Sequence, residues 1–148
     1  MPTLAEQITK PPQRAAVIRD LASLVDVEVA KKGGLSGIGI KTAYAVVKAI
    51  KPTFIPEAID GMLDDMTARL EKIYGECLVA TGGTVASRFA ARAPAVADCL
   101  LGVTDERAER TTHTTAKKAY LKLRPMAKRN VEEAVPALGT LLAKHAPA

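Results

Sequence analysis

Apolar residues recur every three or four positions over most of this chain, which is the spacing of helices that bury one face. Between residues 12 and 32 the repeating apolar side chains are Val17, Ile18, Leu21, Leu24, Val25 and Val29. The same spacing predicts a second helix over about residues 40 to 51, with Ala43, Val46, Val47 and Ile50 inward. A third helix is predicted from Pro56 to the Gly82-Gly83 pair, with Gly75 as a point where it divides.

The first twelve residues read as a short helical arm. Thr3 and Glu6 have the spacing of a capping box, in which each side chain accepts a hydrogen bond from the backbone of the other residue. Pro11 and Pro12 follow within two turns and stop the helix, because proline lacks the backbone N–H that a helix interior needs.

The C-terminal half is divided by caps and prolines. Thr84 is the expected N-cap of a fourth helix, and Pro94 is expected to begin a fifth that reaches residues 105 to 107. Residues 111 to 115 form a polar connector. We expect Pro125 and Pro136 to divide the remainder into two or three helices.

These patterns predict an all-α fold with six to eight helices in a single compact domain over residues 1 to 148. No segment alternates apolar and polar residues between hairpin turns, so strands have little support. The chain is 48% hydrophobic and only 3% aromatic, with no tryptophan. The core must therefore be rich in alanine, leucine and valine, and these small side chains let helices pack closely.

The net charge is +5, which admits nucleic acid, acidic proteins or anionic lipid surfaces as partners. No stretch reaches the roughly 20 apolar residues of a membrane span, and residues 1 to 12 lack an apolar leader core, so we expect a soluble cytoplasmic protein. Cys77 and Cys99 are far apart and fall on apolar helical faces, which favours buried free thiols over a disulfide.

The most informative segment is the glycine-rich stretch of residues 31 to 51. Its residues 35 to 43 resemble the helix-hairpin-helix DNA-binding motif, whose hairpin reads apolar-x-Gly-apolar-Gly. The resemblance implies that the hairpin amides and the following helix N-terminus meet a DNA phosphate. The candidate anion or nucleic-acid contacts are Gly37, Ile38, Gly39, Lys41, Thr42 and Lys48.

The same glycines have a structural interpretation, which we favour. Ser36 would cap the helix, while Gly37 and Gly39 would let another helix cross against its first turn. A nucleotide-binding P-loop is excluded because Ile40 separates the last glycine from Lys41, whereas that loop needs Gly-Lys-Thr without interruption.

Two charged faces admit both a binding and a purely structural reading. The carboxylates of Glu57, Asp60 and Asp64 share one helical face, which we interpret as a solvated surface rather than a cation site. A basic set could follow a phosphate backbone or form a solvated helix face, with Tyr120 as a stacking candidate. It comprises Lys117, Lys118, Lys122, Arg124, Lys128 and Arg129.

A longer resemblance runs from Lys32-Gly33-Gly34 through Ile50-Lys51-Pro52 to Leu63-Asp64-Asp65. This stretch is similar to a family of small uncharacterised actinobacterial proteins. The resemblance implies a whole helical domain and brings no activity, cofactor or catalytic residue.

Taken together, the sequence predicts a non-enzymatic helical protein of unknown function that acts by binding or assembly, with a protein partner or a second copy of itself. The alternative is sequence-independent nucleic-acid binding through the glycine-rich turn and the basic faces. No nucleophile with a base, acid pair or metal cluster stands at workable spacing, so we expect no catalytic residue, no cofactor and no metal.

Overall fold

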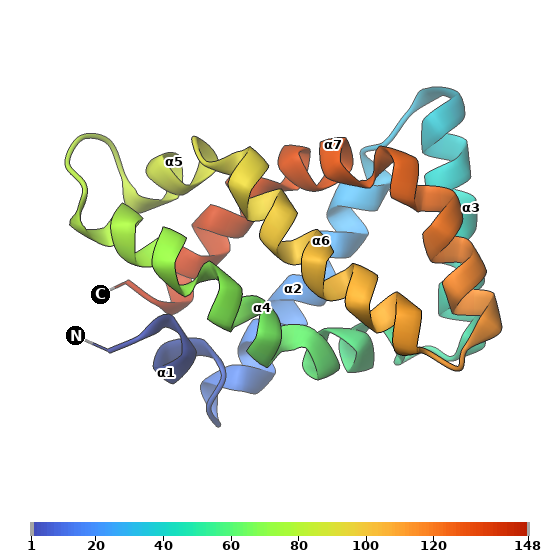
Figure 1. Ribbon diagram of the computed structural model, residues 1–148, viewed down its shortest axis with the longest axis horizontal. Helices are drawn as coiled ribbons and strands as arrows, with labels where there is room; N and C mark the ends of the chain where they lie inside the picture. The colour runs from blue at the N-terminus through green and yellow to red at the C-terminus, as the bar shows by residue number, and fades with distance from the viewer. Residues whose placement is uncertain (1, 148) are drawn as a thin grey trace.

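The computed structural model describes residues 2 to 147, and their regular structure consists of seven α-helices and no strand (Figure 1). The prediction of an all-α single domain is confirmed. The helices are α1 (Leu4–Ile8), α2 (Gln13–Ala30), α3 (Gly34–Ile50), α4 (Phe54–Val79), α5 (Val85–Ala90), α6 (Ala93–Arg110) and α7 (Thr114–His145). In the described part of the chain, every helix is too short or too polar to cross a lipid bilayer.

The N-terminal arm packs against the rest of the molecule. Thr3 and Glu6 form the predicted capping box, and α1 ends before the two prolines. Leu4 and Ile8 are almost fully buried in the main core. The carboxylate of Glu71 on α4 accepts hydrogen bonds from the backbone N–H groups of Leu4 and Ala5, at 2.8 and 3.3 Å. These bonds satisfy donors that a helix N-terminus would otherwise leave unpaired.

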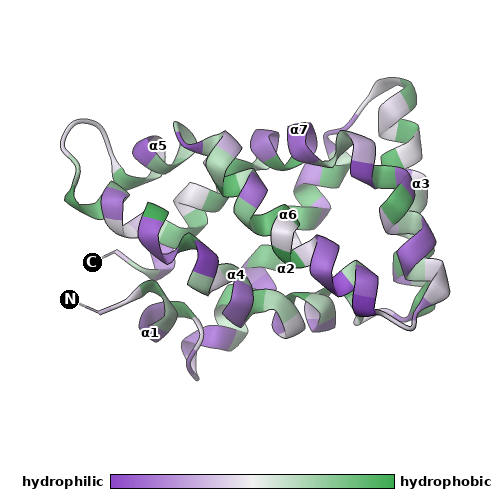
Figure 2. Cartoon of the chain, viewed as in Figure 1, coloured by the Kyte–Doolittle hydropathy of each residue, from purple (hydrophilic) through white to green (hydrophobic). Residues whose placement is uncertain are grey.

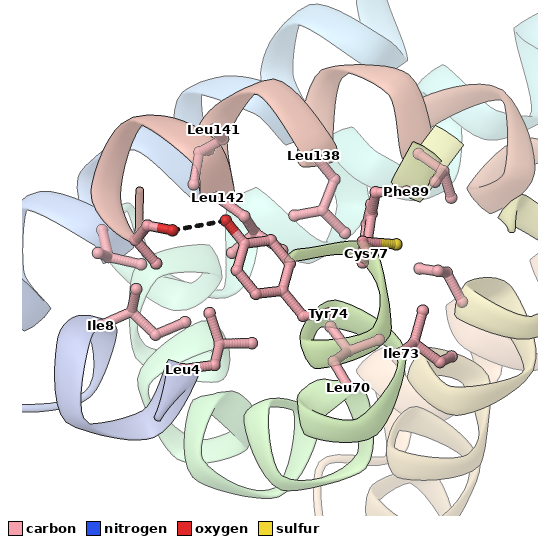
Figure 3. Packing of buried hydrophobic residues seen from close by; sticks show 14 of the residues in the cluster. Leu4, Ile8, Leu70, Ile73, Tyr74, Cys77, Phe89, Leu138, Leu141 and Leu142 are labelled. Atoms are coloured by element: carbon pink, nitrogen blue, oxygen red, sulfur yellow. Dashed lines mark hydrogen bonds between the residues drawn. The ribbon is translucent and has the colours of Figure 1, made fainter. Parts of the chain in front are cut away.

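The core lies where α1, α2, α4, α5, α6 and the C-terminal part of α7 meet, and Figure 3 shows part of it. Its two largest fully buried side chains are Tyr74 and Phe89, whose rings meet edge to face with centroids 6.0 Å apart. Leu70, Leu138 and Leu142 fill the space around them. A few aromatic rings among many aliphatic side chains fill this space, as the composition predicted.

Both cysteines are free thiols. Cys77 is buried in the core, and burial raises the pKa of its thiol because the thiolate loses hydration. Cys99 is only partly buried on α6, where its thiol lies 3.5 Å from the backbone carbonyl of Arg69. The absence of a disulfide between these two residues agrees with the sequence prediction, while the burial of Cys99 is less than predicted.

Three predicted helix breaks are wrong. The helix α4 runs through Gly75 without interruption, and α7 continues for 32 residues through Pro125 and Pro136. Figure 1 shows α7 changing direction along its length, so its prolines bend the helix instead of ending it. Contacts with α3, α5 and α6 hold its successive parts in place, and this packing outweighs the loss of the proline N–H groups.

Candidate functional site

The chain turns between α2 and α3 at residues 31 to 34, earlier than the sequence predicted. Gly33 is extended and is the N-cap of α3, while Gly34 has a φ of +69°, a left-handed value that suits glycine. The resemblance to the helix-hairpin-helix motif implied a hairpin at Gly37, Ile38 and Gly39, but these residues lie within the first two turns of α3. Ser36 is likewise inside the helix and is not its cap.

Gly37 and Gly39 have different surroundings. A Cβ atom on Gly37 would lie 2.7 Å from the carbonyl carbon of Lys32, so this position requires glycine for close packing. Its neighbour is the preceding turn of its own chain, whereas we had expected a crossing helix. A Cβ atom on Gly39 would have no heavy atom within 4 Å. Gly39 therefore leaves a shallow depression in the exposed surface of α3.

The other candidate contacts lie on the exposed surface of α3. Ile38, Lys41, Thr42 and Lys48 are exposed, whereas Gly37 is buried. Lys48 already has an internal role, since its ammonium group lies 3.4 Å from the Asp26 carboxylate and 5.2 Å from the centroid of the Tyr44 ring. The Tyr44 hydroxyl also donates to Asp26 and, with Lys48, lowers the pKa of that carboxyl.

An apolar stripe on α3 faces outward, which the sequence did not predict. Leu35 is 89% exposed, Ile38 63% and Val46 40%, although Val46 was expected inside. At 100° per residue these three positions fall on one side of the helix together with Gly39 and Thr42. We call these five residues the α3 face. Figure 2 shows that α3 carries hydrophobic positions at an edge of the molecule.

A groove lies between α3 and the first turns of α7, which run side by side in opposite directions (Figure 1). Its volume is about 330 Å³. The residues that line it are Gly39, Thr42, Ala43 and Val46 from α3, and Thr115, Lys118, Ala119 and Lys122 from α7. The fold therefore brings the glycine-rich segment of α3 beside Lys118 and Lys122 of the basic set, although the two regions are far apart in the sequence.

The basic set divides into neutralised and free members. Arg124 pairs with Asp105 at 2.8 Å, Lys128 with Asp98 at 3.0 Å, and Arg129 with Glu133 at 3.4 Å. Within residues 2 to 147, Lys117, Lys118 and Lys122 form no ion pair, and neither does Lys41 on α3. Of these unpaired lysines, Lys118 and Lys122 line the α3–α7 groove, where their charge remains available to a partner.

The Tyr120 ring is not free to stack on a base. Its hydroxyl lies 2.7 Å from that of Thr104 and donates to Asp105, and the ring is partly buried. Burial and the hydrogen bond to Asp105 raise the pKa of Tyr120 to about 12, because both oppose formation of the phenolate. Tyr120 links α6 to α7 and serves the fold.

The acidic face of α4 is occupied by basic side chains. Arg14 donates to Asp60 at 2.9 Å and to Asp64 at 3.0 Å, and Lys51 lies 3.0 Å from Glu57. These contacts tie α2 and the α3–α4 turn to α4. The carboxylates therefore have a structural role, and they also form the exposed acidic surface that the sequence predicted, with side chains 54%, 58% and 72% exposed in Glu57, Asp60 and Asp64.

Comparison with known proteins identifies a family but no activity. A family model described as a family of unknown function (DUF6918) matches residues 4 to 146. No curated protein matches, and neither does any solved structure.

Proposed function

We propose that this chain, which belongs to the DUF6918 family of unknown function, is a binding protein that recognises another protein through the α3 face. The observation that carries the proposal is the clustering of exposed aliphatic side chains there. Isolated exposed aliphatic residues are normal on a protein surface, but a contiguous group is typical of an interaction site. Leu35 and Ile38 are neighbours one turn apart on α3, and Val46 lies about two turns further along the same side of the helix.

The fold does not require these side chains to be apolar. The inner side of α3 packs through Gly37, Ile40 and Ala43, which are buried, whereas the side chains of Leu35 and Ile38 are mostly exposed to solvent. Apolar surface left in water lowers solubility and contributes nothing to folding, so its presence supports a role in association.

The chemistry of the surface also supports binding over catalysis. The polar residues that line the groove are two threonines and two lysines. A general acid–base pair would need groups that titrate near neutral pH, such as a histidine or a perturbed carboxylate. We therefore assign recognition, and no reaction, to the α3 face.

The proposal is tested by recovering the partner from cells that naturally express the protein. Tagged wild-type protein is compared with Ile38→Asp, which places a charge on the α3 face. The matched control is Val79→Asp, because Val79 is 74% exposed and lies at the end of α4, on the opposite side of the molecule from α3 (Figure 1). We expect a partner that wild type and Val79→Asp retain and Ile38→Asp loses.

Two outcomes would count against the proposal. One is that no protein is enriched by the wild type over the Ile38→Asp variant. The other is equal loss in both variants, which would indicate general damage to solubility. A sizing experiment over a range of concentrations shows whether the recovered partner is a second copy of the chain.

A second candidate function is sequence-independent nucleic-acid binding. It is favoured by Lys118 and Lys122, which line the groove together with Gly39 and Thr42, and by the exposed Lys41 on α3. Each phosphate that the protein neutralises should add about 0.9 to the slope of log affinity against log salt for duplex DNA. Undetectable binding near physiological salt would reject this function, as would a slope that Lys118→Ala and Lys122→Ala leave unchanged.

A further inference from the structure

We infer that the partner segment recognised by the α3 face is an amphipathic helix with acidic residues along both edges of its apolar side. The inference rests on the proposed function and adds the chemistry of the partner. Three observations carry it: the shape of the α3–α7 groove, the small residues that line it, and the lysines on either side of the α3 face.

The groove suits a helix. Gly39, Ala43 and Ala119 are small, and no atom occupies the space where a Cβ atom of Gly39 would lie. A partner backbone can therefore approach closely, as it does in helix-in-groove recognition. From Leu35 to Val46 the α3 face extends roughly 16 Å, which matches about three turns of a partner helix.

Lysines border the α3 face on both sides. Lys118 and Lys122 are one turn apart on α7 and form one wall of the groove. Lys41 is exposed and, at 100° per residue, lies on the edge of α3 that faces away from α7. Within the described residues none of the three forms an ion pair, whereas more than half of the lysines and arginines of the chain do.

Charge complementarity selects this partner over the alternatives. In a two-fold contact between two α3 faces, lysines would meet lysines, which disfavours a second copy as the occupant. A nucleic acid would engage the lysines but leave Leu35 and Ile38 in water, and Tyr44 and Tyr120 are both held by carboxylates. Carboxylates spaced one turn apart on a helix would meet Lys118 and Lys122, while its apolar side would cover Leu35 and Ile38.

A display library of helical peptides tests the inference. The library has aliphatic residues at positions i, i+3, i+4 and i+7 and all other positions randomised, and it is selected on the wild-type protein with counter-selection on Ile38→Asp. We expect enrichment of glutamate and aspartate beside the apolar stripe. The selected peptides should bind at least tenfold more weakly to the double variant Lys118→Glu, Lys122→Glu, and peptides with lysine in place of the glutamates should recover affinity for that variant.

The matched control is the double variant Lys10→Glu, Lys72→Glu, since both lysines are exposed and without an ion pair in the structure, and neither lines the groove. It should bind the selected peptides as the wild type does. Neutral or basic selected peptides would overturn the acidic partner and leave the proposed function intact. The same conclusion would follow if the library gave no binders while the wild type still recovered a cellular partner that Ile38→Asp loses. Absence of both would reject the two proposals together, and tighter binding of duplex DNA at the same lysines would assign the groove to nucleic acid.

Discussion

The Tyr74 hydroxyl donates a hydrogen bond of 2.7 Å to the backbone carbonyl of Ala146, joining α4 to the residue that follows α7 (Figure 3). Both residues are almost fully buried. The carbonyl belongs to a helix C-terminus, where such groups have no partner within the helix. The bond therefore fixes the end of the 32-residue helix to the centre of the core.

Tyr74→Phe should lower the free energy of unfolding by about 1 to 3 kcal/mol, because it leaves the Ala146 carbonyl buried without its donor. Urea denaturation measures the change. Tyr44→Phe is a suitable comparison, since the Tyr44 hydroxyl donates to the exposed carboxylate of Asp26, and we expect a smaller loss. Equal losses of unfolding free energy in the two variants would show that burial does not increase the contribution of the Tyr74 hydrogen bond to stability.

Alanine substitutions at two glycines of α3 should have opposite effects. Gly37→Ala should destabilise the protein by about 1 to 3 kcal/mol, because the added Cβ would lie 2.7 Å from the backbone of Lys32. Gly39→Ala should stabilise it by about 0.5 to 1 kcal/mol, since the position is helical and open. Thermal unfolding of both variants checks the pair, and a stabilising Gly37→Ala would refute the close contact.

These glycines also show how far the sequence could predict the site. It located the turn between the helices and offered close packing as one use of its glycines. The glycine with the left-handed backbone is Gly34. The spacing of the glycines cannot predict which of them is left-handed, because glycine adopts this conformation wherever the tertiary structure requires it.

The helices were predictable where one apolar stripe faces one core, as in α2. Prediction failed in α7, where contacts with α2, α3, α5 and α6 hold a helix that Pro125 and Pro136 would otherwise interrupt. The groove could not be predicted from the sequence for a related reason. It depends on Gly39 lying beside Lys122, and on ion pairs that neutralise Arg124 and Lys48 but not Lys118. Periodicity along one helix carries no information on such long-range pairing.

Acid should weaken the attachment of the C-terminus to α2. The Asp20 carboxylate lies 2.9 Å from Lys144 and 2.7 Å from His145, and hydrogen bonds with Lys144 and then His145 lower its pKa from 3.8 to about 2. A carboxyl with a lowered pKa stabilises the fold above its unfolded pKa and loses that contribution as the pH falls from about 4 to about 2.

The Asp20→Asn variant should therefore be less stable than the wild type at about pH 5, and the difference should shrink towards about pH 2. Urea denaturation at several pH values in this range measures it. Asp98→Asn is a suitable control, because it removes a more exposed carboxylate that pairs only with Lys128. A difference for Asp20→Asn that stays constant with pH would contradict the lowered pKa.

All three tyrosines should ionise at a higher pH than an exposed tyrosine does. Burial raises the pKa of Tyr44, Tyr74 and Tyr120, in the last case to about 12. Their absorbance should change little near pH 10, where tyrosines of the unfolded chain titrate. A raised phenol pKa also means that stability falls as the pH rises above about 10, because only the unfolded state releases the proton readily.

A spectrophotometric titration compares the folded protein with the protein in guanidinium chloride. In the variant Asp105→Asn, the pKa of Tyr120 should fall, since the carboxylate that opposes its ionisation is gone. A folded protein in which the phenols titrate near pH 10 while the helical signal is unchanged would disprove the shifts.

Two isoleucines of α3, two residues apart, should differ sharply in their contribution to stability. Ile40 is 7% exposed and packs inward, so Ile40→Ala should cost about 2 to 5 kcal/mol through lost burial and the cavity that remains. Ile38→Ala should change the free energy of unfolding by no more than about 0.5 kcal/mol, because its side chain is 63% exposed and alanine favours a helix. Chemical denaturation of the isolated protein measures both, with sizing of each sample. A large loss for Ile38→Ala would mean that Ile38 is covered in solution. If it also depended on protein concentration, the cover would be a second copy of the chain and the α3 face would not be free for another partner.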